Sequence, residues 1–409
     1  MKIVSAYSGG LDTSVMIPWL SENYGGAEII AYTGDLGQGE DLSAIREKAL
    51  RTGACKAVVE DIQDRFVQEF IWPSIMASAI YEGLYPLHTA LGRPLLAERL
   101  VATALAEGAE AVAHGCTGKG NDQVRFEVAI RSLAPQLKIL APLREWELVT
   151  RDLEVEYAEA RKIPIPVTKE KPYSIDQNIW GCAIEAGEME DLWTEPPVDV
   201  WRMTKDPAQA PKGSIELVLR FEQGIPVAID DKPMGGVELL TYLNNIAGTF
   251  GVGRIDMVEN RVVGLKSREV YEAPAATLLH MAHTELERLC LDRPTFNYMR
   301  RISQDYANII YDGGWFGPLR ECLQAFIEES QRTVSGEVRI RVSAGLARVT
   351  GRRSPFSLYD PGLSTYHDGD TFKKEHAEGF LELYGLSYKT VAEVRRKSGK
   401  PEFQWRSKA

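Results

Sequence analysis

The chain has 409 residues, 44% of them hydrophobic and 26% charged, which is an ordinary globular composition with enough length for two domains with separate cores. A formal net charge of −11 and a pI near 5.3 argue against a broad basic surface, so we expect no nucleic-acid partner. No stretch approaches the roughly 20 uninterrupted apolar residues of a membrane-spanning helix, and the first apolar run is too short for a signal peptide, so we expect no membrane contact and a cytoplasmic location.

Short apolar runs in the N-terminal part of the chain predict the strands of one sheet. They span residues 2–7, 28–33, 56–62, 109–115 and 138–143. Segments of helical period follow them, such as 41–53 and 125–134. This alternation indicates an α/β fold, with a parallel, doubly wound sheet whose two faces are covered by helices. In such folds ligands bind at the carboxyl ends of the strands, near a switch in strand order.

The alternation ends at residues 161–172, RKIPIPVTKEKP, where three prolines disfavour both a helix and a continuous strand. We therefore predict a nucleotide-binding domain at 1–165 and an α+β domain, for synthetase chemistry and multimerisation, at 166–369. The second domain shows mixed signals. They are hairpins at 214–230, with Gly224 near the turn, and at 341–351, and helices at 276–291 and 319–334.

Residues 370–409 are amphipathic and charged, which predicts a C-terminal helical arm. The Leu, Phe and Tyr side chains of the arm form an apolar stripe with no evident place to be buried on their own subunit. We therefore expect the arm to contact another subunit.

Three other patterns favour structural roles over sites. Two histidines share a helix face in HMAH (280–283), but no third ligand is in sight, so we expect no zinc. The arginines of 338–353 alternate along a strand and predict a solvated face. The cysteines lie far apart without a C-x-x-C pair, so we expect reduced thiols, mainly in the core. They are Cys55, Cys116, Cys182, Cys290 and Cys322.

The stretch AYSGGLDTSV (6–15) links the first predicted strand to the first helix. Gly9 and Gly10 permit a close approach of the backbone, while Asp12, Thr13 and Ser14 fall in the first helical turn. The free N–H groups and the dipole of a helix N-terminus attract an anion without a cationic side chain. The stretch lacks the lysine of a Walker A loop and the pattern of a GxGxxG turn. A capped helix with a tight turn remains the alternative.

SGGLDTS resembles the SGGxDS pyrophosphate loop of the ATP pyrophosphatase superfamily. Further segments, in the family's order and covering most of the chain, resemble the argininosuccinate synthase family. They are IAYTGDLGQGED (30–41), EFIWPSI (69–75), HGCTGKGNDQVRFE (114–127), APLREW (141–146), IPIPVTKEKPYSIDQNIWG (163–181), GVGRIDMVENRVVGLKSREVYEAPAATLL (251–279) and SPFSLYD (354–360).

The resemblance implies an AMP-forming ligase that makes a C–N bond in arginine biosynthesis. The ureido oxygen of L-citrulline attacks the α-phosphorus of Mg²⁺-ATP, pyrophosphate leaves, and the amine of L-aspartate displaces AMP from the citrullyl-adenylate. The family also implies a homotetramer, with the C-terminal arm reaching across an interface. The sequence does not identify the residue that holds Mg²⁺. Asp12 is a candidate either for this role or for orienting a loop donor. No side chain stands out as general base for the aspartate amine, and a phosphate oxygen of the adenylate is one option.

The resemblance also assigns residues to ATP and to the chemistry. The nucleotide set is Ala6, Tyr7, Ser8, Gly9, Gly10, Leu11, Asp12, Thr13, Ser14, Gly34 and Gly115. The catalytic set is Ser8, Asp12, Ser14 and Arg125. Because adenylyl transfer gains most from in-line orientation and charge stabilisation, we expect the loop amides, Ser8, Ser14 and Mg²⁺ to support the first step.

The segment HGCTGKGNDQVRFE offers glycines, a hydroxyl, an ammonium, an amide, a carboxylate and a guanidinium within a short span, which suits a small zwitterion. The alternative is a glycine-rich turn with a solvated helix start. The family implies that Thr117, Asn121 and Asp122 hold aspartate and that Asn121 and Arg125 reach citrulline. For citrulline it further implies Tyr85, Thr89, Ser174, Glu259 and Tyr271.

Position 183 departs from the family pattern. Many bacterial relatives read WGRS after YSIDQN, whereas this chain reads WGCA, with Cys182 and Ala183. A methyl group can neither donate nor accept a hydrogen bond, so we expect somewhat weaker binding of citrulline. The alternative is that the local backbone is shifted and position 183 no longer faces the substrate.

Two other functions remain open. Another adenylating enzyme of the superfamily, tRNA-thiolating or amide-forming, would predict paired cysteines, a glutaminase domain or a basic RNA-binding face, and the sequence has none of these. A non-catalytic protein that only binds adenine nucleotides would leave GKGNDQVRFE and the second domain unexplained.

Overall fold

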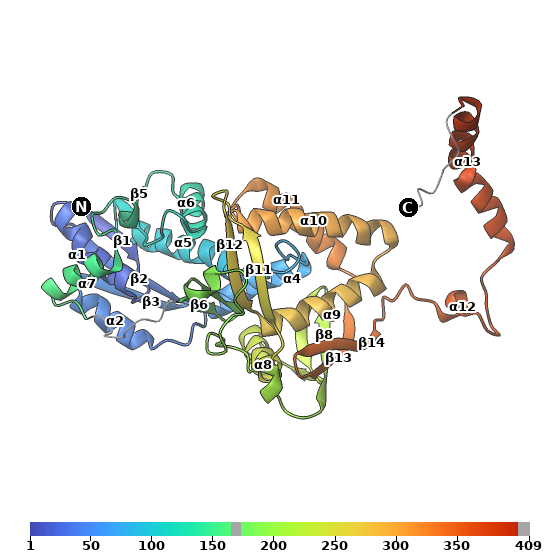
Figure 1. Cartoon of the computed structure of the whole chain (residues 1–409), viewed down its shortest axis with the longest axis horizontal. Coiled ribbons are helices and arrows are strands. Elements are labelled where there is room, and N and C mark those ends of the chain that lie inside the picture. Colours follow the sequence, from blue (N-terminus) through green and yellow to red (C-terminus); the bar gives the residue numbers. More distant parts are fainter. Residues whose placement is uncertain (165–172, 400–409) are drawn as a thin grey trace. The chain divides into compact units, whose positions relative to one another are not determined.

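The computed structural model describes residues 1–164 and 173–399, and the chain divides into two compact units, one at 1–356 and one from Ser357 onward. The second unit contains α12 (Pro361–Ser364) and α13 (Glu375–Lys397) (Figure 1). The domain limits expected from the sequence stay predictions, and the limit between 165 and 166 lies outside the described residues.

A five-stranded parallel sheet forms the N-terminal part of the first unit, which confirms the predicted fold class. Its order is β3-β2-β1-β4-β5. The strands are β1 (Lys2–Ala6), β2 (Glu28–Asp35), β3 (Lys56–Asp61), β4 (Ala111–Ala113) and β5 (Lys138–Leu140). Because β1 pairs with β2 on one edge and β4 on the other, the strand order switches between β1 and β4. Their carboxyl ends therefore flank a natural ligand position.

Helices cover both faces of this sheet because neighbouring residues of a strand point to opposite sides. Ile3 belongs to a core with α1, α2 and α7, whereas Val4 belongs to a separate core with α5 and α6. The helices are α1 (Leu11–Asn23), α2 (Leu42–Arg51), α7 (Arg151–Ala160), α5 (His88–Ala106) and α6 (Asp122–Leu133). This arrangement confirms the doubly wound sheet.

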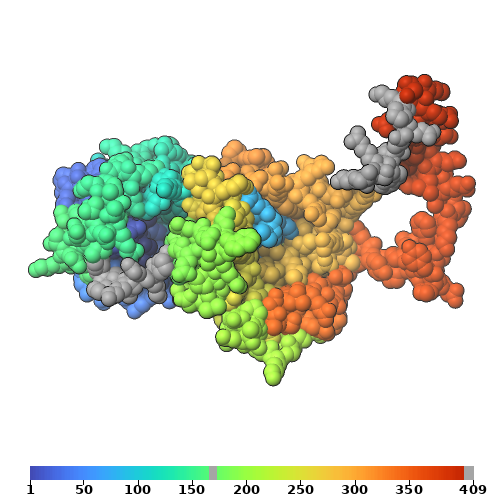
Figure 2. All heavy atoms as spheres, viewed as in Figure 1, coloured from blue at the N-terminus to red at the C-terminus, as the bar shows by residue number. Residues whose placement is uncertain are grey.

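The segment between β3 and α5 enters the largest core of the first unit. It forms α3 (Gln63–Phe66), a π-helical turn (Val67–Ile71) and α4 (Trp72–Met76). Phe66, Phe70 and Trp72 are buried in one cluster with Leu240 and Leu279 of the C-terminal half. In Figure 2 the blue and teal atoms of the N-terminal part lie directly against green and yellow atoms. The two parts of the first unit therefore share a core.

Two antiparallel sheets and further helices complete the first unit. One sheet has the order β11-β12-β7-β6 and the other β10-β9-β8-β13-β14. Their strands are β6 (Ser174–Asn178), β7 (Gly181–Glu185), β8 (Ser214–Glu222), β9 (Ile225–Ile229), β10 (Lys232–Pro233), β11 (Arg254–Asn260), β12 (Lys266–Glu272), β13 (Gly336–Ser343) and β14 (Leu346–Arg353). The helices are α8 (Gly236–Thr249), α9 (Pro274–Cys290), α10 (Arg293–Tyr311) and α11 (Pro318–Gln331), with 3₁₀ turns at Pro142–Arg144, Gly187–Glu190 and Pro207–Gln209.

The predicted elements of the C-terminal half are confirmed. The strands β8 and β9 form the first hairpin, and Gly224 in its turn has φ +81°, a conformation that favours glycine. The strands β13 and β14 form the second hairpin and extend beyond the predicted residues. Helices α9 and α11 match the two predicted helices.

His280 and His283 are buried in α9, and the described residues hold no group of three potential metal ligands, so the expectation of no zinc stays a prediction. The expectation that the cysteines lie mainly in the core is wrong for Cys55 and Cys322, which are exposed, whereas Cys182 and Cys290 are buried. None of the helices in the described ranges combines the length and apolarity needed to cross a bilayer.

Candidate active site

A cavity of about 1140 Å³ opens at the carboxyl edge of the parallel sheet. Its walls come from the ends of β1, β2 and β4, the N-terminal turns of α1, α5 and α6, and the antiparallel sheet that contains β6, β7, β11 and β12. The cavity therefore lies at the predicted switch point, where the two parts of the first unit meet.

The glycine-rich loop forms one end of the cavity. Gly9 has φ +78°, and Gly10 begins α1 in an extended conformation without a side-chain cap. The first N–H groups of α1 therefore have no capping side chain and are available to an anion. The hydroxyl oxygens of Ser8 and Thr13 lie 3.1 Å apart beside them.

Lys48 is a cation at this loop that the sequence analysis missed. It projects from α2, lines the cavity, and its Nζ donates a hydrogen bond of 2.5 Å to the carbonyl oxygen of Gly9. Burial lowers the pKa of Lys48. The loop therefore combines backbone donors with one ammonium group, in contrast to the purely backbone site that the sequence predicted.

Two nucleotide-loop residues are not brought to the cavity wall. Leu11 and Ser14 are absent from its lining. Ser14 is fully buried, and its Oγ donates to the carbonyl oxygen of Gly10 at 2.7 Å and lies 3.2 Å from the Tyr7 hydroxyl. Its hydroxyl is thus occupied in stabilising the first turn of α1.

Asp12 lines the cavity and interacts with a second carboxyl group, that of Glu154 in α7. Burial, followed by the hydrogen bond with Asp12, raises the pKa of Glu154 to about 8. A protonated Glu154 can donate a hydrogen bond to the carboxylate of Asp12.

Gly34 and Gly115 bring the backbone of β2 and the segment after β4 to the cavity. A Cβ at Gly34 would lie 2.7 Å from Leu96 Cδ2 and 2.8 Å from Ile62 Cδ1, so a larger residue would have to displace these side chains. A Cβ at Gly115 would lie 3.2 Å from the Thr13 methyl group. Gly115 therefore allows the loop and the segment after β4 to approach each other.

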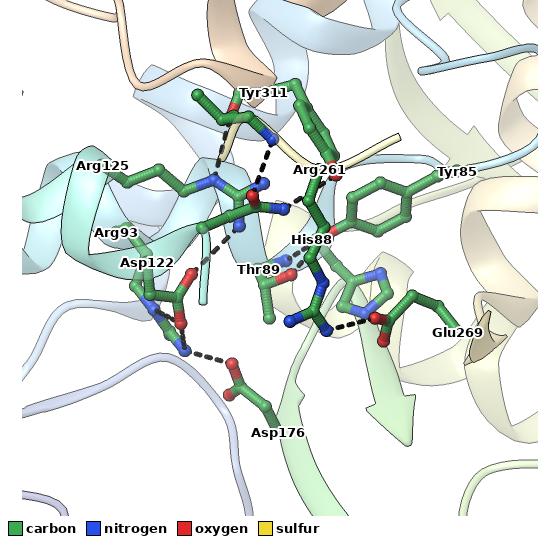
Figure 3. A network of polar contacts seen from close by, with 12 residues as sticks. Tyr85, His88, Thr89, Arg93, Asp122, Arg125, Asp176, Arg261, Glu269 and Tyr311 are labelled. Atoms are coloured by element: carbon green, nitrogen blue, oxygen red, sulfur yellow. Dashed lines mark hydrogen bonds and ion pairs between the residues drawn. The ribbon is translucent and has the colours of Figure 1, made fainter. Parts of the chain in front are cut away.

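An ion-pair network lines the cavity, and Figure 3 shows its side chains. Arg93 of α5 donates to Asp122 through Nε at 2.9 Å, and its Nη2 also contacts Asp176 of β6. Arg125 Nη1 donates to the other oxygen of Asp122 at 3.0 Å. Burial raises the pKa of Asp176, while the two arginines lower the pKa of Asp122 despite its burial.

Arg125 retains one unused donor. Its side chain is 4% exposed, and its Nε donates to the carbonyl oxygen of Tyr311 at 3.0 Å. Its Nη2 is buried and has no hydrogen-bond partner among the described residues. A buried, unpaired guanidinium nitrogen beside a cavity is suited to an anionic ligand.

A second polar cluster surrounds Glu259 of β11. Tyr271 and Tyr311 donate to its two oxygens at 2.6 and 2.5 Å, and Asn121 Nδ2 donates to the Tyr311 hydroxyl at 2.8 Å. Burial raises the pKa of Glu259. Tyr85 stacks on Tyr271 with ring centroids 4.2 Å apart, so the cluster is rigidly packed.

Strand register brings distant residues of the antiparallel sheet together at this wall. Ala183 of β7 pairs with Tyr271 on one side and with Asp176 on the other. Ser174 begins β6, and both Ser174 and Ala183 line the cavity.

A third charged cluster was missed from the sequence. Arg261 contacts Glu185 and donates to Glu269 at 2.5 Å, while its Nη1 donates to the carbonyl oxygen of Lys119 at 3.3 Å. Burial, followed by the charge of Glu185, raises the pKa of Glu269 to about 7. The loop before α6 is thereby tied to the turn between β11 and β12.

The cavity thus brings together every predicted site residue except Leu11 and Ser14. The predicted site residues that line the cavity are Ala6, Tyr7, Ser8, Gly9, Gly10, Asp12, Thr13, Gly34, Tyr85, Thr89, Gly115, Thr117, Asn121, Asp122, Arg125, Ser174, Ala183, Glu259 and Tyr271. Among the missed residues, Arg93 lies one helical turn after Thr89, a spacing that places both on one face of α5. Asp176 lies inside the segment YSIDQN that the sequence analysis had already singled out.

Comparisons with known proteins agree with this geometry. The family described as the arginosuccinate synthase N-terminal HUP domain matches residues 2–164, and the arginosuccinate synthase C-terminal domain matches residues 173–391. A protein of Pelodictyon phaeoclathratiforme named argininosuccinate synthase is 55% identical over 393 residues, which cover 96% of this chain and 98% of the relative. The protein of that name from Chlorobaculum tepidum is 54% identical over 395 residues, with 97% and 98% covered.

Solved structures give a weaker comparison. The U34-tRNA thiolase NcsA from Methanococcus maripaludis covers 42% of this chain and 61% of its own, at 16% identity and a TM-score of 0.26. This likeness is too low to carry an argument about function.

Proposed function

Because the chain belongs to the argininosuccinate synthase family and is an ATP-dependent ligase that joins citrulline to aspartate through a new C–N bond, we propose the following roles for its cavity. The observation that supports them is the placement of the glycine-rich loop, the Arg93–Asp122–Arg125 network and the Glu259 cluster around one cavity. One site can then hold ATP, citrulline and aspartate together, as successive adenylation and displacement require.

ATP is held by the loop from Ala6 to Thr13, with Gly34 and Gly115 against the nucleotide. The N–H groups at the start of α1, Ser8 and Lys48 bind the β- and γ-phosphates, since they combine helix-end donors with a positive charge. The α-phosphorus is left open to the citrulline ureido oxygen. Ser14 acts indirectly, by fixing the turn through Gly10.

Mg²⁺ accompanies ATP. A magnesium ion usually takes one or two protein carboxylates besides phosphate oxygens, and Asp12 at the loop fits that requirement. The ion would neutralise phosphate charge and so favour departure of pyrophosphate. Glu154 contacts Asp12 and would hold it toward the loop.

Citrulline lies between Arg125 and Glu259. The unpaired Nη2 of Arg125 binds its carboxylate, and Glu259 binds its ammonium group, because each is a buried group of the opposite charge. Tyr85, Thr89, Ser174 and Tyr271 complete the walls, and Ala183 contributes only its methyl group.

Aspartate lies next to citrulline, against Thr117, Asn121 and Asp122. The carboxylate of Asp122 attracts the ammonium group of aspartate, while Thr117 and Asn121 supply neutral hydrogen-bonding groups. After the adenylate forms, the aspartate nitrogen attacks the activated ureido carbon and AMP leaves.

We further propose a homotetramer in the cytoplasm. The apolar side chains of α13 are exposed, with Leu383 at 77% and Tyr384 at 63%, which supports burial on another subunit. The free cysteines among the described residues support a reducing compartment.

Product analysis tests the proposed route. Incubation with ATP, citrulline and aspartate should give AMP, pyrophosphate and argininosuccinate in equal amounts, and ¹⁸O in the ureido group of citrulline should end in AMP. Label in pyrophosphate, or ADP as product, contradicts attack at the α-phosphorus. An enzyme that forms no pyrophosphate without a tRNA or ammonia donor would instead be another adenylating member of the superfamily.

A further inference from the structure

The cavity contains two carboxylates that share one guanidinium group. Arg93 Nη2 lies 2.7 Å from Asp122 Oδ2 and also contacts Asp176 Oδ2. Asp122 begins α6 and Asp176 lies in β6, so the two come from different parts of the first unit. Figure 3 shows the carboxylates of both residues pointing toward the guanidinium group of Arg93.

The two carboxylates have different environments. Both oxygens of Asp122 are bound, Oδ1 by Arg125 and Oδ2 by Arg93. Asp176 contacts Arg93 through Oδ2 only, and its Oδ1 accepts no hydrogen bond from the described residues. The side chain of Asp176 is 34% exposed, and the residue lines the cavity. Asp176 therefore presents an unused oxygen beside the group that holds aspartate.

The charged and titratable groups around Asp176 set its proton affinity. They are Arg93, Asp122, Arg125, Glu40, Cys116 and Cys182. Burial raises the pKa of Asp176, Arg93 opposes this, and the negative charge of Asp122 adds to the rise. The arginines lower the pKa of Asp122. Neighbouring acids whose pKa values are pushed apart are typical of acid–base pairs, with one kept ionised and the other able to take up a proton.

The proposed displacement needs such a proton acceptor. The amino group of aspartate is protonated at neutral pH and has no free electron pair until it loses a proton. Among the other buried carboxylates of the wall, Glu259 receives a tyrosine hydroxyl on each of its oxygens. Glu269 receives Arg261 and Ser267 on Oε1 and belongs to the Arg261 cluster, whereas Asp176 shares Arg93 with Asp122, the proposed partner of aspartate.

On the basis of the proposed function, we propose that Asp176 is a catalytic residue, the general base that takes the first proton from the ammonium group of substrate aspartate. The proton moves from nitrogen to the Asp176 carboxylate. The freed electron pair then forms the C–N bond to the activated carbon, the C–O bond to AMP breaks, and its electron pair leaves on the AMP oxygen. The second nitrogen proton passes to that AMP phosphate as the new guanidinium group forms.

The test separates the two half-reactions in Asp176→Asn, which keeps the shape of the side chain but removes the base. Citrulline-dependent exchange of pyrophosphate into ATP reports adenylation, and single-turnover reaction of the preformed adenylate with saturating aspartate reports displacement. We expect exchange within about threefold of the unchanged enzyme and displacement slower by about 10² to 10⁴, as for loss of a general base. In the pH–rate profile of displacement, the rate of the unchanged enzyme should fall at low pH. This low-pH limb of the profile should be absent in the variant.

Hydroxylamine provides a discriminating nucleophile, because it is largely uncharged at neutral pH and needs no base. It should consume the adenylate at similar rates in both proteins. Glu40→Gln is the matched control: Glu40 also lines the cavity near Asp176, but no hydrogen bond or ion pair joins it to Arg93. In this variant the rate of displacement should still fall at low pH, with at most a shift of the pH at which it falls.

The outcomes are distinguishable. If Asp176 only positions Arg93, the variant should have a higher aspartate KM and should keep the low-pH limb. Its adenylate should then react more slowly with hydroxylamine to the same extent as with aspartate. This result would overturn the proposal. Equal loss of exchange and displacement also overturns it. If the unchanged enzyme gives no citrulline-dependent exchange, the proposed function fails before the role of Asp176 is tested.

Discussion

Lys48 Nζ donates to the carbonyl oxygen of Gly9 at 2.5 Å, so a cation from α2 touches the loop at the start of α1. We expect Lys48→Met to raise the KM for ATP about 10- to 100-fold, because a charge-assisted contact is worth about 1.5 to 3 kcal/mol. The KM values for citrulline and aspartate should change little. Arg46→Met, on an exposed position of the same helix, is the control, and an equal effect there would show that only general charge matters.

Asp122 pairs with both Arg93 and Arg125, and we propose that it also holds aspartate. Asp122→Asn should weaken aspartate binding by about 10-fold or more while citrulline-dependent pyrophosphate exchange stays measurable, since a hydrogen bond to a charged group contributes about 1.5 to 3 kcal/mol. Initial rates of the two half-reactions provide the measurement. Equal losses in both half-reactions contradict the assignment, and circular dichroism identifies a damaged fold.

Ala183 lines the cavity between Tyr271 and Asp176. We expect Ala183→Ser to lower the citrulline KM about 2- to 12-fold, which corresponds to one neutral hydrogen bond of about 0.5 to 1.5 kcal/mol. The KM values for ATP and aspartate should stay nearly constant in steady-state kinetics. A citrulline KM that is unchanged or higher would mean that position 183 does not face the substrate.

His280 is buried in α9, and burial lowers its pKa to about 3 in the folded chain, against about 6.5 when unfolded. As the pH falls, His280 is therefore protonated in the unfolded chain before it is protonated in the folded chain. The stability that depends on the neutral ring is complete above about pH 6.5 and is lost as the pH falls toward about 3.

Replacing this histidine should reduce acid sensitivity. Between about pH 7 and pH 5, His280 accounts for about 2 kcal/mol of lost unfolding free energy, and His280→Leu should remove that part of the decrease. Urea unfolding at both pH values measures it. His376→Leu, at an exposed position of α13, should leave the decrease unchanged, and a full decrease in His280→Leu would refute the assignment.

No residue of α13 is buried, although the helix carries Phe380, Leu383 and Tyr384. Deletion of 370–409 should therefore give species smaller than the proposed tetramer in light scattering. Leu383→Glu with Tyr384→Glu in the full chain should have the same effect, because burying charges without partners is costly. A tetramer that persists in both proteins would exclude the arm from the interface.

The sequence predicted the parallel sheet well because its signals are local. Each strand is a short apolar run followed by a helical period, and residues 2–7 and 28–33 correspond closely to β1 and β2. The site residues of the loop follow from that local pattern and from the family motif. Ser14 is the instructive exception, since its hydroxyl is turned to Gly10 and away from the cavity. A motif specifies residues but not the rotamers of their side chains.

The network around Arg93 could not be predicted because it depends on pairing between distant segments. Asp176 reaches Arg93 only through the packing of β6 against α5, and Tyr311 reaches Glu259 from the end of α10. The position of Lys48 could have been predicted from the sequence, since the capping residue Asp41 fixes the start of α2 and hence the face on which Lys48 lies. Contacts of this kind need the register and packing of the whole unit.

The shared core of the first unit has a consequence for synthesis on the ribosome. A nascent chain that ends near residue 165 already contains every strand of the parallel sheet, yet Phe66, Phe70 and Trp72 belong to a cluster completed by residues such as Leu240 and Leu279. Those aromatic rings stay without their partners until far more of the chain has emerged. We therefore expect the early translation product to expose apolar surface and to be prone to aggregation until the rest of the first unit has been synthesised.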